Sequence, residues 1–189
     1  MIIGIYGKKR HGKDTIADFL CKKYGFVKYG FGDPIKEISR IIFGFTDEQL
    51  YGEQKDIIDS YWNIKPRDFF QKFGTDYGQF IFPDHFPSIF NDTNKRDIWV
   101  KLFVNWYKQQ KKMNPLLKVV VNDIRFIHEY NSIKELGGYI IKVYRDIPDK
   151  DNHLSESELD NFTTDKFNHI ILNDKTKDHL YKYMIDLIN

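Results

Sequence analysis

The residues whose spacing first suggests chemistry lie near the start of the chain, in the segment GKKRHGK at positions 7–13. It matches the pattern G-x-x-x-x-G-K, in which two glycines allow the tight curl that turns backbone N–H groups toward an anion. A helix beginning near Lys13 would add the positive end of its dipole to the same anion. The spacing therefore predicts a phosphate-binding loop, with Lys13 reaching the β- and γ-phosphates of a nucleoside triphosphate.

The next residue departs from the usual form of this loop. Asp14 stands where a Ser or Thr normally binds Mg²⁺, and Thr15 follows it. A carboxylate suits the same task, because Mg²⁺ prefers oxygen ligands. The alternative is a surface turn that matches the pattern by chance. The apolar run Met1–Tyr6 before the loop and the amphipathic stretch Ile16–Tyr24 after it favour a strand, a phosphate loop and a helix.

Two more charged residues follow an apolar run late in the chain. The run Leu117–Asn122 predicts a strand that ends at Asp123, and Arg125 lies two residues further on. Ligands of doubly wound sheets bind at the carboxyl ends of strands. Asp123 is therefore a candidate for holding Mg²⁺ or its water shell, and Arg125 for binding phosphate through its planar guanidinium. Structural alternatives are that Asp123 caps the next helix and that Arg125 pairs with Glu129, one turn along.

The middle and the end of the chain offer weaker candidates. Arg67 follows Pro66 at a predicted helix start, where a cation is unfavourable unless an anion binds nearby or Asp68 compensates. We expect this helix to run to about Tyr77 with an interruption at Gly74, and residues 80–94 to form a loop or a short excursion. The charged segment 145–160 is a candidate lid over phosphates, with a solvated loop as the alternative. Asn173 follows the last predicted strand, where a nucleotide base would rest.

The pattern of elements predicts an α/β fold. Apolar runs at 1–6, 26–31, 117–122, 139–144 and 169–172 are separated by helical stretches, as in a parallel sheet of five strands flanked by helices. The helical span at about 33–112 is too long for a single crossover. We therefore expect one domain with a core at 1–32 and 113–189, a helical substrate-binding insert at about 33–112 and a lid at about 146–165.

Composition limits the partners. The 189 residues include 41% hydrophobic and 16% aromatic residues, which is typical of a folded protein, and one cysteine, which excludes an intrachain disulfide. The net charge of +2 demands no nucleic-acid surface. No apolar stretch is long enough to span a bilayer. We expect a soluble, cytoplasmic protein without nucleic-acid or membrane partners, and the aromatic-rich insert as the face of any homodimer.

Several segments together resemble the deoxynucleoside monophosphate kinases of bacteriophages and large DNA viruses. The opening GKKRHGKDTIADFL at 7–20 is similar to the family's G-x-K-R-x-G-K-D-T-x-A-D motif, including the aspartate after the lysine. The likeness covers nearly the whole chain. It continues in FGDPIKE (31–37), IFGFTDEQLYGEQKD (42–56), PRDFFQKFGTDYG (66–78), VVNDIRFIHEYNSIKELGG (120–138), HLSESELD (153–160) and the strand-Asn-Asp pattern at 170–174.

The resemblance implies a nucleoside-monophosphate-kinase fold of the P-loop class, ATP as phosphoryl donor, Mg²⁺ as cofactor and a deoxynucleoside 5′-monophosphate as acceptor. The implied catalytic residues are Lys13, Asp14 and Arg125; the ATP site Gly7, Lys9, Gly12, Lys13, Thr15 and Asn173; and the Mg²⁺ ligands Asp14 and Asp123. The implied acceptor site comprises Asp33, Lys36, Arg67, Gln71, Thr75 and Arg125, and the lid Arg145, His153 and Glu156. The chain departs from the family after Gly78, where Gln79-Phe80 replaces a frequent basic residue.

Two other functions compete with this one. Animal phosphomevalonate kinases have a similar G-K-D loop and the same donor with a different acceptor, although the agreement at 42–56 favours a nucleotide. A nucleotide-binding module without turnover is the second alternative, and the intact Lys13, Asp14, Asp123 and Arg125 argue against it. Family members differ in whether they accept dTMP, dGMP or 5-hydroxymethyl-dCMP, and the sequence leaves the base open.

Overall fold

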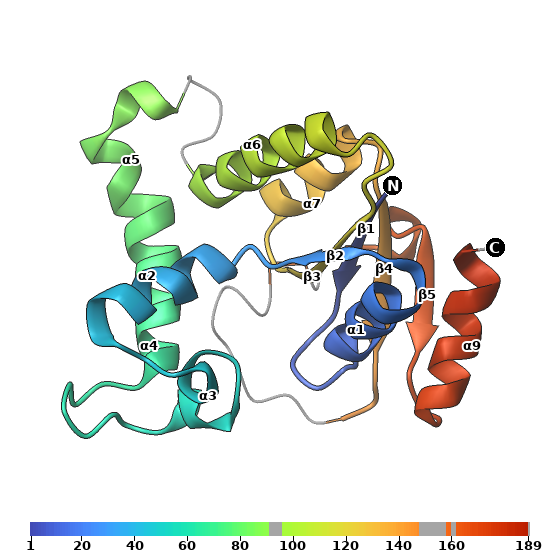
Figure 1. The fold of residues 1–189 in the computed structure, drawn as a ribbon, viewed down its shortest axis with the longest axis horizontal. Helices are drawn as coiled ribbons and strands as arrows, with labels where there is room; N and C mark the ends of the chain where they lie inside the picture. Colours follow the sequence, from blue (N-terminus) through green and yellow to red (C-terminus); the bar gives the residue numbers. More distant parts are fainter. Residues whose placement is uncertain (91–95, 148–157, 160–161, 189) are drawn as a thin grey trace. The chain divides into compact units, whose positions relative to one another are not determined.

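A computed structural model describes residues 1–90, 96–147, 158–159 and 162–188 of the chain. It divides into two compact units (Figure 1). Met1–Gly30 and Val104–Asn189 form the first, here called the α/β unit, and Phe31–Phe103 form the second, here called the helical unit.

The α/β unit is built on a five-stranded sheet in which every pair of neighbours is parallel. The strands are β1 (Ile2–Tyr6), β2 (Val27–Tyr29), β3 (Val119–Ile124), β4 (Tyr139–Tyr144) and β5 (His169–Leu172), in the order β2-β3-β1-β4-β5. The predicted α/β fold with five parallel strands is confirmed. The prediction of a strand over 26–31 is wrong at both ends, since the Phe26 N–H donates to Leu20 O at the end of the first helix instead of joining the sheet.

Helices cover both faces of this sheet (Figure 1). Ile3 and Ile5 of β1 point to the face where α1 (Lys13–Tyr24) and α9 (Lys177–Ile188) pack in one apolar cluster. Gly4 points the other way, to α7 (Ile127–Glu135), where an added Cβ would lie 3.4 Å from Ile133 Cγ2. Because β1 lies between β3 and β4, the loop after β1 and the end of β3 meet at the carboxyl edge of the sheet.

Most of the other described helices lie wholly or partly in the helical unit. They are α2 (Asp33–Phe43), α3 (Asp47–Leu50), η1 (Glu53–Asp56), α4 (Pro66–Gln71), η2 (Lys72–Ile81), α5 (Phe82–His85), η3 (Pro87–Ile89) and the start of α6 (Ile98–Met113). A short turn, η4 (Thr164–Lys166), belongs to the α/β unit. So does the second half of α6, where Trp106 packs on Tyr29 of β2 with ring centroids 4.7 Å apart. The helical unit therefore ends at Phe103, before the expected end of the insert near residue 112.

The predicted break at Gly74 is wrong, and so is the loop prediction over residues 80–85. The chain remains helical from Pro66 to His85, with a π-helix at Lys72–Ile81. Its glycines make room for an indole: the Trp99 Nε1–H donates to Gly74 O at 2.7 Å, and a Cβ on Gly78 would lie 2.7 Å from Trp99 Cζ2. Close approach, and not a chain break, thus accounts for both glycines. Residues 91–94 of the predicted loop lie outside the described residues.

Aromatic rings form much of the interior of the helical unit. The Phe43 and Phe69 ring centroids lie 4.8 Å apart, those of Phe69 and Phe73 lie 5.0 Å apart, and Phe73 continues to Trp99 at 6.4 Å. Such pairs add to the stabilisation from burial of apolar area. In the described part of the chain, no helix is both long and apolar enough to cross a membrane.

We predict that Trp99→Phe lowers the free energy of unfolding by about 1–3 kcal/mol, because it leaves the buried Gly74 carbonyl without this donor. Trp62→Phe is the matched control. The Trp62 indole also donates to a carbonyl, Phe43 O at 2.8 Å, but its side chain is 42% exposed, so water can replace the bond. Urea denaturation followed by circular dichroism measures both changes. Equal losses for the two variants would contradict the role given to Trp99.

Candidate active site

The predicted phosphate loop connects β1 to α1, and packing fixes its two glycines. An added Cβ on Gly7 would lie 2.3 Å from Val143 O, and one on Gly12 would lie 2.4 Å from Asn173 Nδ2. Gly12 also has φ of 104°, a left-handed conformation that side chains rarely adopt. The buried Asn173 donates from Nδ2 to His11 O at 2.9 Å. Val143 near the end of β4 and Asn173 just after β5 therefore fix the position of the loop.

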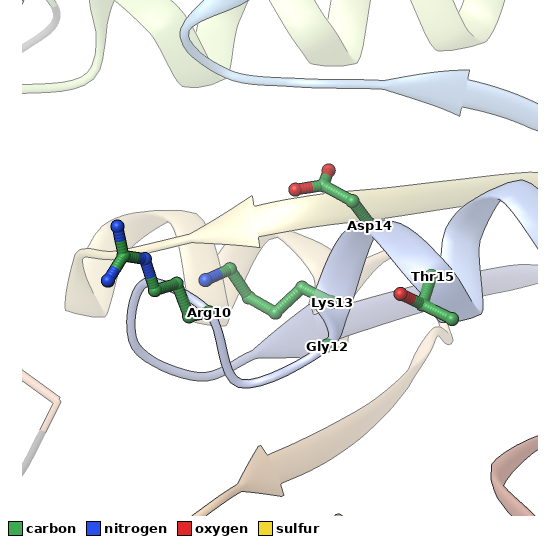
Figure 2. A pocket seen from close by; sticks show the side chains of 5 residues that line it. All are labelled: Arg10, Gly12, Lys13, Asp14 and Thr15. Atoms are coloured by element: carbon green, nitrogen blue, oxygen red, sulfur yellow. The ribbon is translucent and has the colours of Figure 1, made fainter. Parts of the chain in front are cut away.

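Lys13 extends back into this loop from the first turn of α1 (Figure 2). Its Nζ donates to Lys8 O at 2.8 Å, and the residue is only 9% exposed. A pocket of about 170 Å³ opens here, lined by Arg10, Gly12, Lys13, Asp14 and Thr15. The lysine that would bind a phosphate thus reaches the backbone curl that the pattern predicts.

The electrostatics of Lys13 favour an anion. Burial, with the Arg125 guanidinium as the second cause, lowers the pKa of its ammonium to about 8. The carboxylates of Asp14 and Asp123 oppose that decrease. A cation that is buried and repelled by a second cation gains from a negative ligand beside it, so the site is suited to phosphate.

Asp14 is held on the opposite side of the helix start. Its Oδ1 accepts a hydrogen bond from Asn122 Nδ2 at 2.5 Å and lies 3.4 Å from Lys28 Nζ. The protein atoms around this exposed side chain displace part of its surrounding water, which favours the neutral acid, but Lys28, Asn122 and Lys13 together keep the pKa of Asp14 below its ordinary value. The carboxylate is therefore ionised at neutral pH, as a Mg²⁺ ligand must be.

The turn after β3 is organised by a buried carboxylate. Asp123 lies within β3, before its last residue, and the start of α7 is capped by Glu129. Glu129 Oε2 accepts hydrogen bonds from the backbone N–H groups of Arg125 at 2.7 Å and Phe126 at 3.1 Å. Burial, with the Asp123 charge, raises the pKa of Glu129 to about 8. The contact between Glu129 and Arg125 thus involves the arginine's backbone N–H, whereas the alternative considered from sequence was a side-chain ion pair.

The remaining candidates of the α/β unit lie around the same edge. Lys9 is exposed, Thr15 lines the pocket, and Arg145 Nε donates to Asn173 O at 2.8 Å. Two lid candidates, His153 and Glu156, lie outside the described residues.

The candidates for acceptor binding lie in the helical unit. Asp33 and Lys36 form an ion pair at 3.0 Å at the start of α2, and Thr75 is buried on η2, one turn from the half-buried Gln71. Arg67 pairs through two nitrogens with Asp56, including Nη2 to Oδ2 at 3.3 Å. This carboxylate, and not that of Asp68, offsets the cation at the start of α4.

The structure adds three residues to these sites that are difficult to identify from the sequence. Lys28 and Asn122 hold Asp14, and only their places near the ends of β2 and β3 could have suggested this. Arg96 Nε donates to the buried Gln79 at 3.0 Å, next to Gly78. No local pattern predicts that contact, because the two residues are 17 positions apart.

The residues present fit a Mg²⁺ ion that is shared with a nucleotide. Among the described residues there is no group of three or more His, Cys, Asp or Glu side chains able to hold a metal by themselves. Mg²⁺ in kinases is commonly bound by one or two carboxylates together with phosphate oxygens and water. Asp14 beside the pocket, with Asp123 at the end of β3, supplies that kind of donor set.

A family model and a relative of this chain carry the same description. The family model for deoxynucleotide monophosphate kinase matches residues 1–55 and 46–184. A protein of Acanthamoeba polyphaga mimivirus named "Putative deoxynucleotide monophosphate kinase" is 36% identical over 193 aligned positions, which cover 100% of this chain and 96% of that protein. Among solved structures, the dephospho-CoA kinase from Campylobacter jejuni has a TM-score of 0.45 at 14% identity, covering 99% of this chain and 95% of that one.

The lowered pKa of Lys13 predicts how phosphate binding depends on pH. Free Lys13 with a pKa of about 8 loses its charge as the pH rises, so the affinity for inorganic tripolyphosphate should fall about eightfold between about pH 7.5 and about pH 9. Lys13→Arg keeps its charge over that range and should show little of this decrease. Isothermal titration calorimetry measures both. A flat wild-type profile would mean that Lys13 has an ordinary pKa or does not contact the anion.

Proposed function

The chain belongs to the deoxynucleotide monophosphate kinase family, and from this premise we propose that it transfers the γ-phosphoryl group of ATP to a deoxynucleoside 5′-monophosphate. The products are the deoxynucleoside diphosphate and ADP, as in DNA-precursor synthesis in the cytoplasm. The observation that best supports the proposal is the buried Lys13 ammonium in a glycine-bounded loop, beside the ionised Asp14.

In this proposal the donor phosphates lie in the loop. Loop N–H groups and the start of α1 receive the phosphate oxygens, and Lys13 exchanges its bond to Lys8 O for one to the transferring phosphoryl group. Asp14 and Asp123 would hold Mg²⁺, which neutralises charge on the phosphates when bound. Because phosphoryl transfer depends mainly on positioning and charge neutralisation, no separate catalytic base is required. Gly7 and Gly12 keep the loop open, and Lys9, Thr15 and Asn173 complete the proposed ATP site.

The acceptor's phosphate is assigned to Arg125. Its backbone is fixed by Glu129, which has almost no exposed surface and cannot shift without losing two hydrogen bonds. A guanidinium on so firmly held a turn is well suited to bidentate phosphate binding.

The family resemblance implies further acceptor contacts among residues of the helical unit. Asp33, Lys36, Arg67, Gln71 and Thr75 are the proposed contacts, with Arg145, His153 and Glu156 proposed for the lid. Arg96 adds a cation beside Gln79, next to the position where the family resemblance implies a basic residue. In the resting protein Asp56 neutralises Arg67, so an acceptor phosphate would compete with that carboxylate.

A coupled assay of ADP release tests this function. Protein, ATP and Mg²⁺ are mixed with dTMP, dGMP, dCMP, 5-hydroxymethyl-dCMP or dAMP, with the ribonucleotides, or with phosphomevalonate. We expect turnover with at least one deoxynucleotide, which also identifies the base. Turnover with phosphomevalonate alone would show that the proposed acceptor is wrong, while the proposed donor site would still hold. ATP binding without turnover on any acceptor would contradict the proposal and favour a non-catalytic nucleotide-binding module.

Arg125→Ala should raise the acceptor KM at least tenfold, an estimate of about 1.4 kcal/mol or more for a lost charge-assisted contact, while the ATP KM changes little. Arg40→Ala is the matched control, because it removes the same guanidinium from the surface, where Arg40 pairs with Glu37 and Asp47. Steady-state kinetics with each substrate varied in turn gives both constants. An unchanged acceptor KM and kcat in Arg125→Ala would remove this residue from the acceptor site.

A further inference from the structure

Asp14, in the first turn of α1, has two polar partners. Asn122 reaches it from β3 at 2.5 Å, and Lys28 reaches it from β2 at 3.4 Å. Both partners bind the same oxygen, Oδ1, so the carboxylate is held in one orientation. Its side chain is nevertheless 73% exposed, which leaves it accessible to an ion from solution.

Lys28 is shared between two carboxylates on one face of α1. Its Nζ lies 3.0 Å from Asp18 Oδ1, closer than to Asp14. Asp14 and Asp18 are four residues apart and so face the same side of the helix. The ammonium can therefore leave Asp14 and keep an ion pair with Asp18, without a change in the backbone.

We propose that Lys28 is a positioning residue for the metal site, holding the Asp14 carboxylate in the metal-free protein and passing wholly to Asp18 when the divalent cation binds with a nucleotide. This inference rests on the proposed function, since it takes Asp14 as a Mg²⁺ ligand. Among the described residues, Lys28 and Asn122 are the side chains that bond to the Asp14 carboxylate.

The physical reason is competition between two cations for one anion. An ammonium beside the metal ligand lowers the affinity for Mg²⁺ through charge repulsion, while it keeps the carboxylate oriented before the ion arrives. Asp18 reduces the cost of the exchange, because Lys28 remains paired after it leaves Asp14. Asn122 is neutral and can keep its hydrogen bond throughout. The arrangement makes metal binding depend on the nucleotide, whose phosphates add the missing negative charge.

The test measures how Mg²⁺ strengthens ADP binding, which requires no turnover. Calorimetry of ADP binding at a series of free Mg²⁺ concentrations gives the concentration for half of the full gain in affinity. Lys28→Met should lower this concentration about two- to fivefold at low ionic strength, in the range expected for one exposed charge pair. The effect should shrink as salt is added. Lys28→Arg, which retains the charge, should restore the wild-type value.

Lys118→Met is the matched control. It removes the same charge near the start of β3, where Lys118 Nζ contacts Tyr24 O, and should leave the half-saturating Mg²⁺ concentration unchanged. Asp18→Asn provides a second test. It should raise the half-saturating Mg²⁺ concentration more in the wild-type background than in the Lys28→Met background. Only the wild-type background has an ammonium that must leave Asp14 and pair with residue 18.

The outcomes separate this inference from the proposed function. If Lys28→Met leaves the Mg²⁺ requirement unchanged, or raises it, while Asp14→Asn strongly reduces the gain from Mg²⁺, the role of Lys28 is wrong and Asp14 remains a metal ligand. If Asp14→Asn has no effect on the gain, the proposed metal site itself is wrong. Equal changes in Lys28→Met and Lys118→Met would show a general effect of net charge and overturn the inference.

Discussion

Burial of the Lys13 ammonium within a curled loop is the constraint on which the candidate site depends. The amine is nearly enclosed, its bond to Lys8 O is to a neutral carbonyl, and Arg125 repels it. Asp14 and Asp123 offset that cost only in part, as its lowered pKa shows. A phosphate group would supply the missing negative charge. The free protein is thus electrostatically incomplete at the position where the proposed donor would bind.

The surroundings of the loop serve to hold this charge in place. Val143 O and Asn173 press on Gly7 and Gly12 so closely that a side chain at either position would collide with them. On the other side, Asn122 and Lys28 fix Asp14. These contacts come from β2, β3, β4 and the residue after β5. Strands across the whole parallel sheet therefore fix the positions of the loop and of the first turn of α1. Stability of the sheet and geometry of the site are therefore linked in the α/β unit.

The sequence predicted the α/β unit well because its signals are local. A strand, a glycine-bounded loop and a helix follow one another within 24 residues, and the apolar strand β3 leads directly to Asp123. The helical unit was predicted less well. Gly74 and Gly78 suggest a break unless one knows that Trp99 packs on them from a distant helix. The pairing of Arg67 with Asp56 and the contact of Arg96 with Gln79 likewise depend on tertiary structure, which residue spacing does not encode.

A crystal structure of the protein with Mg²⁺ and a non-hydrolysable ATP analogue would show directly where Lys13 and the loop lie around the phosphates. We predict that Lys13 Nζ leaves Lys8 O and binds the terminal phosphates, with the loop between Gly7 and Gly12 wrapped around them and Asp14 directed at the metal. A complex in which Lys13 keeps its bond to Lys8 O while the triphosphate lies outside the loop would contradict it.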